Sequence, residues 1–165
     1  YELSQIDGVP SVMPYQVPFR QLTTLLQTYS GDIDAVIAKL GDVKPEQEEC
    51  LRRRCECAWY WVKECAPEDF KFALREDGSK ADLSGDFLNA IKRIRDEVVI
   101  KLESYQVDKD LQQAMYDIAK EIGIDPKALF TSMYQVLIAK DQGPRLASFM
   151  KIIGKDKLNK LLENY

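Results

Sequence analysis

Residues 129–154 read LFTSMYQVLIAKDQGPRLASFMKIIG, and this stretch decides the fold class. Its first ten residues place apolar side chains three and four positions apart, the spacing that forms one buried face of an α-helix. Gly143-Pro144 then breaks the chain, because proline lacks the backbone N–H that a continuing helix needs. A second apolar run follows as far as Gly154, which favours a helix stop. The stretch therefore predicts short helices joined by tight breaks.

The same pattern extends over most of the chain. Apolar periodicity, with Asp or Pro at helix starts and Gly at helix ends, predicts helices over about 18–29, 33–40, 45–65, 84–105, 108–122, 126–138, 145–153 and 155–164. Phe70, Phe72 and Leu74 alternate with polar residues instead, which is typical of an extended chain. The predicted fold class is all-α, a multi-helix cage or bundle of about seven to eight helices with one short extended segment near 70–75.

Two stretches suggest how the 165 residues are organised. Residues 1–17 contain Pro10 and Pro14, which forbid a long helix, so we expect them to be a connector from an upstream domain. Asp77-Gly78 is a favoured turn pair, and we predict a possible boundary between two subdomains near residues 77–84. Residues 18–165 are then the helical region.

Composition excludes several classes of function. The chain carries 23 basic and 27 acidic side chains, a net charge of −4, which argues against a protein that coats nucleic acid by charge alone. Histidine is absent, which removes the commonest general base and metal nitrogen ligand. The glycines form no phosphate-binding loop, and no apolar run approaches the ~20 residues of a membrane span. We therefore predict no catalytic site, no metal or cofactor and no membrane partner for this chain.

All four cysteines lie between Cys50 and Cys65, without the paired spacing of a zinc site. On a helix, Cys50, Cys57 and Cys65 share one face. We expect the cysteines to be small buried hydrophobic residues in a reducing, cytoplasmic environment.

The long helix predicted in the first half of the chain carries two candidate binding residues. Arg54 lies on its apolar side, so the guanidinium needs a partner that offsets the cost of burial. That partner is either a carboxylate of the protein or a phosphate or base in a cavity. Trp59 lies on the opposite side, where it either packs on a neighbouring helix or stacks on an unpaired base, worth about 1–3 kcal/mol. Trp61 is predicted to be core, and Arg52 and Arg53 to be solvated.

Residues 140–160 carry six basic and two acidic side chains, an excess opposite in sign to the net charge. Lys140, Arg145 and Lys151 belong to this group. Arg145 lies at a predicted helix start, where a positive side chain opposes the helix dipole. We therefore expect an anionic partner for it, either an acidic side chain or an RNA phosphate. The group as a whole is either a phosphate-contacting patch or a solvated amphipathic end.

Three motifs occur in order along the chain. They are Val17-Pro18-Phe19-Arg20-Gln21-Leu22, then Arg54-x-x-x-Ala58-x-x-Trp61 followed by Ala66-Pro67-Glu68, and finally Lys140-Asp141-x-Gly143-Pro144-Arg145-Leu146. The ordered set resembles the C-terminal, anticodon-binding region of class I lysyl-tRNA synthetases. Ala139 stands where that family usually has glycine, and Phe19 where it usually has tyrosine. The family's catalytic signatures, of the His-Ile-Gly-His and Lys-Met-Ser-Lys kind, are absent.

The resemblance implies a helical cage that recognises the lysine anticodon of tRNA. It also implies a parent lysine–tRNA ligase that activates lysine with ATP on an upstream catalytic domain, whereas this region alone is no enzyme. Its expected partners are tRNA and that upstream domain, and it is expected to be a monomer. The predicted tRNA contacts are Arg20, Arg54, Trp59, Lys140, Arg145 and Lys151. Four of these match motif positions, whereas Trp59 and Lys151 rest on local chemistry alone.

The alternative interpretation is a helical protein-interaction module without an RNA role. It predicts a large exposed apolar groove and indifference to tRNA.

Overall fold

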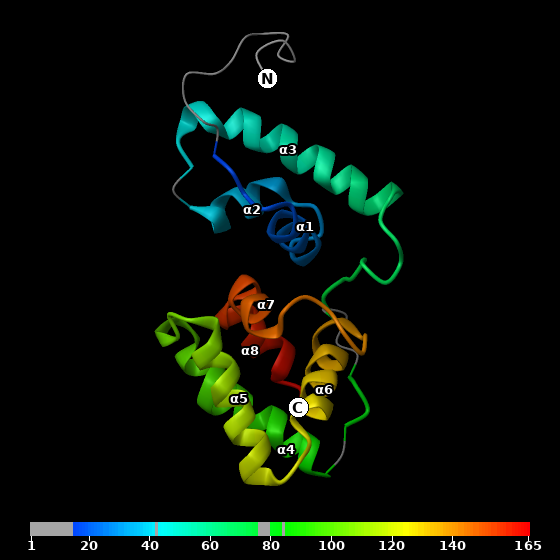
Figure 1. The fold of residues 1–165 in the computed structure, drawn as a ribbon, viewed down its shortest axis with the longest axis vertical. Helices are drawn as coiled ribbons and strands as arrows, with labels where there is room; N and C mark the ends of the chain where they lie inside the picture. The colour runs from blue at the N-terminus through cyan, green and yellow to red at the C-terminus, as the bar shows by residue number, and fades with distance from the viewer. Residues whose placement is uncertain (1–14, 42, 76–79, 84) are drawn as a thin grey trace. The chain divides into compact units, whose positions relative to one another are not determined.

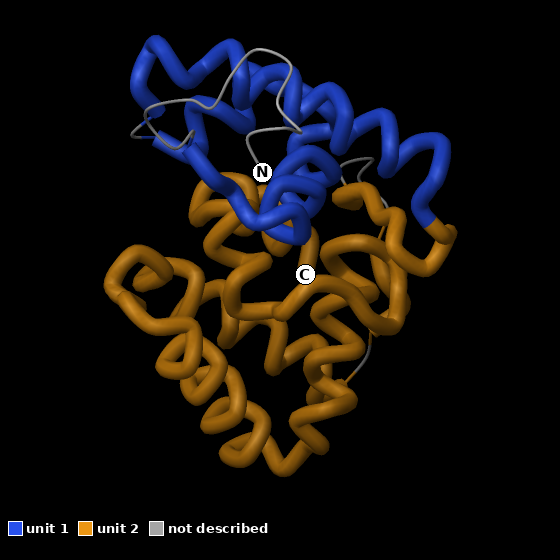
Figure 2. The backbone as a smooth tube through the Cα atoms, turned by 45° about the horizontal axis from the view of Figure 1, so that its top comes forward, with its two compact units in different colours: residues 1–66 blue, residues 67–165 orange. Residues whose placement is uncertain are grey.

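Helices build both compact units into which the chain divides, one ending at Ala66 and the other beginning at Pro67 (Figure 1, Figure 2). The computed structural model describes residues 15–41, 43–75, 80–83 and 85–165. Within these ranges the secondary structure is helical and no strand occurs, so the predicted all-α fold class is confirmed. None of the helices described is long and apolar enough to cross a membrane.

Unit 1 is built on one long helix. Its helices are α1 (Phe19–Thr28), α2 (Ile33–Leu40) and α3 (Pro45–Glu64). α3 packs against both α1 and α2 (Figure 1). Pro45 is the first residue of α3, a position where proline sacrifices no helical hydrogen bond. Asp32 caps α2, because its Oδ1 accepts a hydrogen bond from the backbone N–H of Ala35 at 3.0 Å. The predicted helix limits in this unit closely match the observed ones.

The buried face of α3 differs from the predicted one. The buried residues of this helix are Leu51, Cys55, Ala58 and Val62. Cys50, Cys57 and Cys65, which we expected to be buried, are exposed, so that expectation was wrong for three of the four cysteines. The helix has few large apolar residues on either side, and packing against α1 and α2 selects the side of Leu51.

Unit 2 surrounds one apolar core. Its elements are α4 (Gly85–Arg93), the π-helix η2 (Ile94–Val98), the 3-10 helix η3 (Val99–Ser104), α5 (Asp108–Ile122), α6 (Pro126–Ile138), α7 (Leu146–Ile153) and α8 (Lys155–Leu162). Each of them contributes fully buried side chains to the core, among which that of Phe149 is the largest. α8 packs against η2, η3, α6 and α7, so the last helix closes this core.

The helix predicted over about 84–105 forms as three consecutive segments of different pitch. α4 continues into the wider turn of η2 and then into the tighter η3. Val98, at the end of η2, and Val99, at the start of η3, are both buried. The apolar periodicity identified the helix, whereas packing against α5 and α8 determined its pitch.

The segment 70–75 is irregular and pairs with no strand among the described residues. Phe72 packs edge to face on Phe149, with ring centroids 5.2 Å apart and planes at 77°. Leu74 also packs against the core of unit 2. The backbone N–H of Arg75 donates to Leu137 O, at 2.9 Å, near the end of α6. The alternating apolar residues therefore anchor a connection to the helical core.

The predicted domain limits fall partly on residues that the structure does not describe. Residues 1–14 of the expected connector, and residues 76–79 and 84 around the expected subdomain boundary, lie outside the described ranges. The two compact units themselves divide after α3, between Ala66 and Pro67. The connector and the boundary near 77–84 stay predictions.

Ala139, which follows α6, lies in the left-handed region with φ 54° and ψ 34°. A Cβ atom raises the energy of that conformation by roughly 1–2 kcal/mol, whereas glycine adopts it freely. We expect Ala139→Gly to raise the free energy of unfolding by about 0.5–1 kcal/mol, because the greater freedom of glycine in the unfolded chain offsets part of the gain. Urea unfolding followed by circular dichroism measures this change.

Ala38→Gly is the matched control, because Ala38 is exposed inside α2. It should lower the free energy of unfolding by about 0.5–1 kcal/mol. A loss of stability in both variants would contradict the role assigned to the left-handed turn.

Candidate nucleic-acid interface

The six predicted tRNA contacts fall into two groups, one in each unit. Arg20, Arg54 and Trp59 lie in unit 1, and Lys140, Arg145 and Lys151 lie in unit 2. The contacts that the structure gives these side chains lie within their own unit.

Arg54 ties the segment before α1 to α3. Its Nη1 donates to Tyr15 O at 3.0 Å, and its Nη2 donates to Val17 O at 3.1 Å. The fork of a guanidinium suits two neighbouring carbonyls, and these bonds satisfy a half-buried charge without a carboxylate. The sequence suggested an ion pair or a bound phosphate as its partner, and backbone carbonyls are a third solution. Arg54 thereby positions the chain that enters α1 at Phe19.

Trp59 packs over the turn between α1 and α2. A Cβ atom on Gly31 would lie only 2.4 Å from Cε2 and Nε1 of Trp59, so the indole fills the space that a side chain at position 31 would need. Gly31 also has a φ of +83°, in the region that favours glycine. Of the two roles that the sequence left open for Trp59, the structure supplies the packing role, and base stacking stays a prediction.

Arg20 lies exposed on the first turn of α1. Its carbonyl oxygen accepts hydrogen bonds from the hydroxyls of Thr23 and Thr24, at 3.1 Å and 2.8 Å. These bonds fix the backbone of the turn, and the exposed position leaves Arg20 accessible to an anionic partner.

An open groove in unit 1, which we call the aromatic groove, joins the start of α1 to one face of α3. It is lined by Phe19, Leu22, Cys50, Arg53, Arg54, Cys57, Ala58 and Trp61. Phe19 is 51 % exposed, and its ring meets Trp61 edge to face, with centroids 5.1 Å apart and planes at 75°. Trp61, predicted to be core, is only half-buried. The apolar spacing along α3 predicted that several of these α3 residues share a face. It did not predict that Phe19 of α1 lies against that face.

Asp108, the first residue of α5, contacts two side chains of α7. Lys151 Nζ lies 2.8 Å from Asp108 Oδ1, and the hydroxyl of Ser148 donates to the other carboxylate oxygen. Hydrogen bonds from Lys151 and then Ser148, together with the positive charges of Lys151 and Arg145, lower the pKa of Asp108. Arg145 is exposed and makes no ion pair among the residues that the structure describes, so its anionic partner stays a prediction.

Lys140 fastens the beginning of unit 2 to the end of α6. Its Nζ donates to Glu68 O at 2.8 Å and also to Lys71 O. Like Arg54 in unit 1, this predicted RNA contact is engaged by backbone carbonyls of its own unit.

The break after Lys140 is held close to α6. The hydroxyl of Tyr134 donates to Pro144 O at 2.5 Å. A Cβ atom on Gly143 would lie 2.9 Å from Ile138 Cδ1, so glycine permits the close approach. These contacts determine where α7 begins and hence where Arg145 stands.

Sequence comparison supplies the observation that decides the family. A lysine–tRNA ligase of Treponema pallidum (strain Nichols) is 47% identical over 166 residues, a match that covers 100% of this chain. The chain belongs to the class I lysyl-tRNA synthetases. Lysine–tRNA ligases of Borreliella burgdorferi and Pyrococcus horikoshii are 35% and 32% identical, over 100% and 98% of the chain. No family model matches.

This lysyl-tRNA synthetase chain spans about a third of the length of the curated relatives that it matches, at 31% of the Treponema protein and 32% of the other two. The resemblance drawn from the three ordered motifs is therefore confirmed, and the chain corresponds to one region of these relatives.

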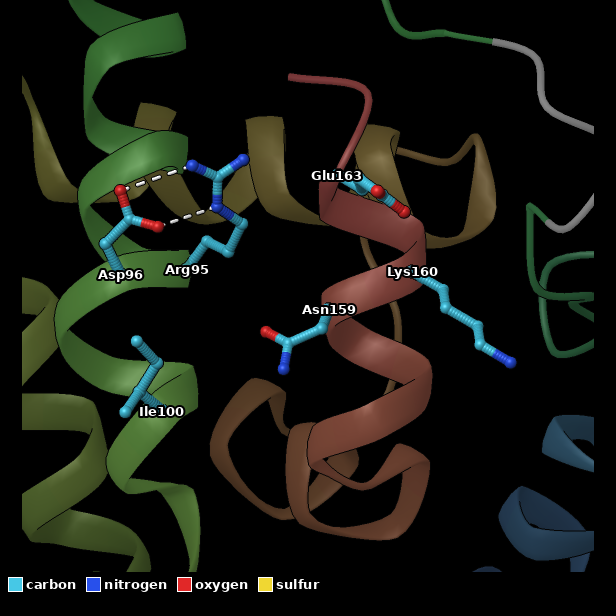
Figure 3. Close-up of a pocket in the computed structure, with 6 residues that line it drawn as sticks. All are labelled: Arg95, Asp96, Ile100, Asn159, Lys160 and Glu163. Atoms are coloured by element: carbon cyan, nitrogen blue, oxygen red, sulfur yellow. Dashed lines mark hydrogen bonds and ion pairs between the residues drawn. The ribbon is translucent and has the colours of Figure 1, made fainter.

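A pocket in unit 2 of this synthetase region is balanced in charge (Figure 3). It is lined by Arg95, Asp96, Ile100, Asn159, Lys160 and Glu163. Arg95 Nε donates to Asp96 Oδ1 at 2.7 Å, and this hydrogen bond lowers the pKa of the carboxyl. Figure 3 shows the amine of Lys160 pointing away from that pair. The pocket therefore lacks the excess of positive charge that attracts a phosphate backbone.

Gly31→Ala should lower the free energy of unfolding by more than the strain of a positive φ alone would. We expect a loss of about 2–4 kcal/mol, because the added Cβ both strains the backbone and displaces the Trp59 indole. Gly123→Ala is the matched control, since Gly123 has the same φ of +83°, in the left-handed region, but its Cβ would meet nothing within 4 Å. The control should lose only about 1–2 kcal/mol in chemical unfolding. Equal losses would show that Trp59 does not occupy this space.

Asp108→Asn should make stability less dependent on acid pH. The pKa of Asp108 is lower in the folded chain than its usual value of 3.8, so its contribution is present above that value and is lost as the pH falls through the folded pKa. At neutral pH the variant should be less stable by about 0.2–1 kcal/mol, as for a partly exposed ion pair. As the pH falls through the folded pKa of Asp108, the difference from wild type should shrink and then vanish. Asp110→Asn, an exposed acid of the same helical turn, is the control in thermal unfolding measured across pH.

Proposed function

We propose that this chain is the tRNA anticodon-binding region of a lysine–tRNA ligase. The observation that carries the proposal is that the whole chain matches about a third of proteins with that name, including one at 47% identity over 166 residues. In the proposed parent enzyme, the remaining part activates lysine with ATP and transfers it to tRNA. Binding, and not chemistry, is then the task of this region, in keeping with a chain that contains no histidine.

The six predicted contacts form the proposed interface in two different ways. Arg20 and Arg145 are exposed and suit direct contact with phosphates or bases. Arg54 and Lys140 donate to backbone carbonyls, so they orient the chain that precedes α1 and the segment that begins unit 2. Trp59 packs over Gly31, and Lys151 forms an ion pair with Asp108. Both contacts help to hold the backbone of the proposed interface in place. Positively charged side chains on a chain of net charge −4 favour local rather than general attraction to RNA.

The proposed partners follow from this role. They are tRNA with a lysine anticodon and the catalytic part of the same enzyme, and the proposed setting is a monomeric enzyme in the cytoplasm.

Binding of this chain to lysine tRNA tests the proposal directly. We expect tighter binding than to the same tRNA with a changed anticodon, and a steep loss of affinity between about 50 mM and about 200 mM salt. Fluorescence anisotropy of labelled tRNA measures both effects. Equal affinity for the two tRNAs would leave a general tRNA-docking surface in place of anticodon recognition. No binding to either tRNA at low salt would contradict the proposal.

Arg145→Ala should weaken tRNA binding roughly 10- to 100-fold, the loss of about one charged hydrogen bond. The slope of log affinity against log salt should become shallower by about one unit, because one phosphate contact is lost. Lys92→Ala, at an exposed position of α4, is the charge-matched control and should bind like wild type. Unchanged affinity in Arg145→Ala would exclude this residue as a contact.

A helical protein-interaction module is the second candidate, because the aromatic groove exposes Phe19 beside other apolar residues. This function predicts indifference to tRNA, so the binding measurement separates the two.

A further inference from the structure

Of the six predicted contacts, only Arg54 lines the aromatic groove, and the two aromatic rings of the groove are not among those contacts. Two aromatic rings, Phe19 and Trp61, meet in it, and more than half of Phe19 is exposed. The eight lining residues include two arginines and no carboxylate, although acidic residues outnumber basic ones in the chain as a whole. Aromatic faces beside positive charge are the features that bind unpaired nucleotides, whose bases stack and whose phosphates are anionic.

The three consecutive arginines of α3 have different surroundings. Arg52 is paired with Asp34 and Glu48. Arg54 donates to two backbone carbonyls, so its position is fixed while its charge remains. Arg53 is exposed at the groove and makes no ion pair among the residues that the structure describes. Arg53 is therefore the cation of this helix best placed to contact a phosphate.

Two other open pockets among the described residues lack this combination. The pocket of Arg95 and Asp96 is balanced in charge and contains no aromatic ring. A third pocket, beside the end of α5, contains Tyr116, but its lining also includes one acid, Asp117, and one base, Lys120. The ring of Tyr116 packs edge to face on Phe130, with centroids 5.0 Å apart. Only the aromatic groove joins two rings to an excess of positive charge among these pockets.

We propose that an unpaired base of the bound RNA stacks against Phe19 and Trp61 in the aromatic groove, with Arg53 contacting an adjoining phosphate. The inference rests on the proposed function, that this chain binds tRNA. The lining offers ring faces and few polar groups that could read a base edge, so the groove holds a base largely irrespective of its identity. Recognition of the anticodon sequence then belongs to other residues of the interface.

A tryptophan reporter tests the stacking step locally. The chain has two tryptophans, so Trp59→Phe leaves Trp61 as the single one. Titration of this variant with lysine tRNA should quench the Trp61 fluorescence in parallel with the binding measured by anisotropy of the labelled tRNA. Phe at position 59 keeps an aromatic ring over Gly31, and thermal unfolding checks that the variant is folded.

Truncation of the exposed ring tests its contribution to affinity. Phe19→Ala should weaken tRNA binding roughly ten- to a hundred-fold, the range for one stacked base, whereas Phe19→Tyr keeps the ring and should bind like wild type. Tyr60→Ala is the matched control, because Tyr60 is 63% exposed on α3 but does not line the groove. It should leave affinity unchanged.

The outcomes separate this inference from the proposed function. Quenching of Trp61, with loss of affinity in Phe19→Ala alone, supports the stacked base. Tight tRNA binding without quenching, and with Phe19→Ala equal to wild type, overturns the inference and leaves the proposed function standing. No tRNA binding by any variant at low salt overturns the proposed function, and the inference with it. Self-association of the chain that Phe19→Ala abolishes would show that a second copy occupies the groove, and this also overturns the inference.

Discussion

The contact between Tyr134 and the Gly143-Pro144 break is the constraint on which unit 2 depends. The Tyr134 hydroxyl donates to Pro144 O, and the absent side chain of Gly143 lets the loop lie against Tyr134 and Ile138. Because the loop is held there, α7 and α8 pack back onto the other helices and bury Phe149 and the α8 leucines. Burial raises the pKa of the Tyr134 hydroxyl above its usual value of 10, which strengthens the preference for the protonated form that a tyrosine already has at neutral pH.

Some positive side chains of this region are bonded to other groups of the protein, whereas others are exposed to solvent. Arg54 and Lys140 each donate to backbone carbonyls far away in sequence, and both thereby satisfy carbonyl groups of irregular chain that no helix pairs. Lys151 is bound to Asp108. Arg20, Arg53 and Arg145 are exposed instead. A basic residue within a family motif is therefore as much a part of the folding of the loops as a candidate for contact with RNA.

This division is compatible with the RNA-binding role that we propose for an acidic chain. With a net charge of −4, the long-range field does not attract a phosphate backbone, so affinity has to come from local geometry. In unit 1 that geometry is a groove with two rings and two arginines, and in unit 2 it is an exposed arginine held at the start of α7. Stacking and local ion pairing lose little to the distant acidic residues, because charges farther apart than about 8–10 Å are screened at physiological salt.

The sequence by itself determined the all-α class, most helix limits and the family. Those features depend on neighbours in the chain: apolar spacing of three and four, proline at helix starts, glycine at helix ends, and motifs in a fixed order. The change of pitch at residues 94–104 and the partners of Arg54 and Lys140 had no such local signal.

The tertiary structure decided which face of α3 is buried, and this is where sequence analysis failed for Cys50, Cys57, Cys65 and Trp61. Two faces of that helix carry similar apolar content, so the choice depends on contact with α1 and α2, which are distant in sequence. The same choice turns Trp61 toward Phe19 and creates the aromatic groove. A pattern within one helix states which residues share a face, but only packing between helices states whether that face meets the core or the solvent.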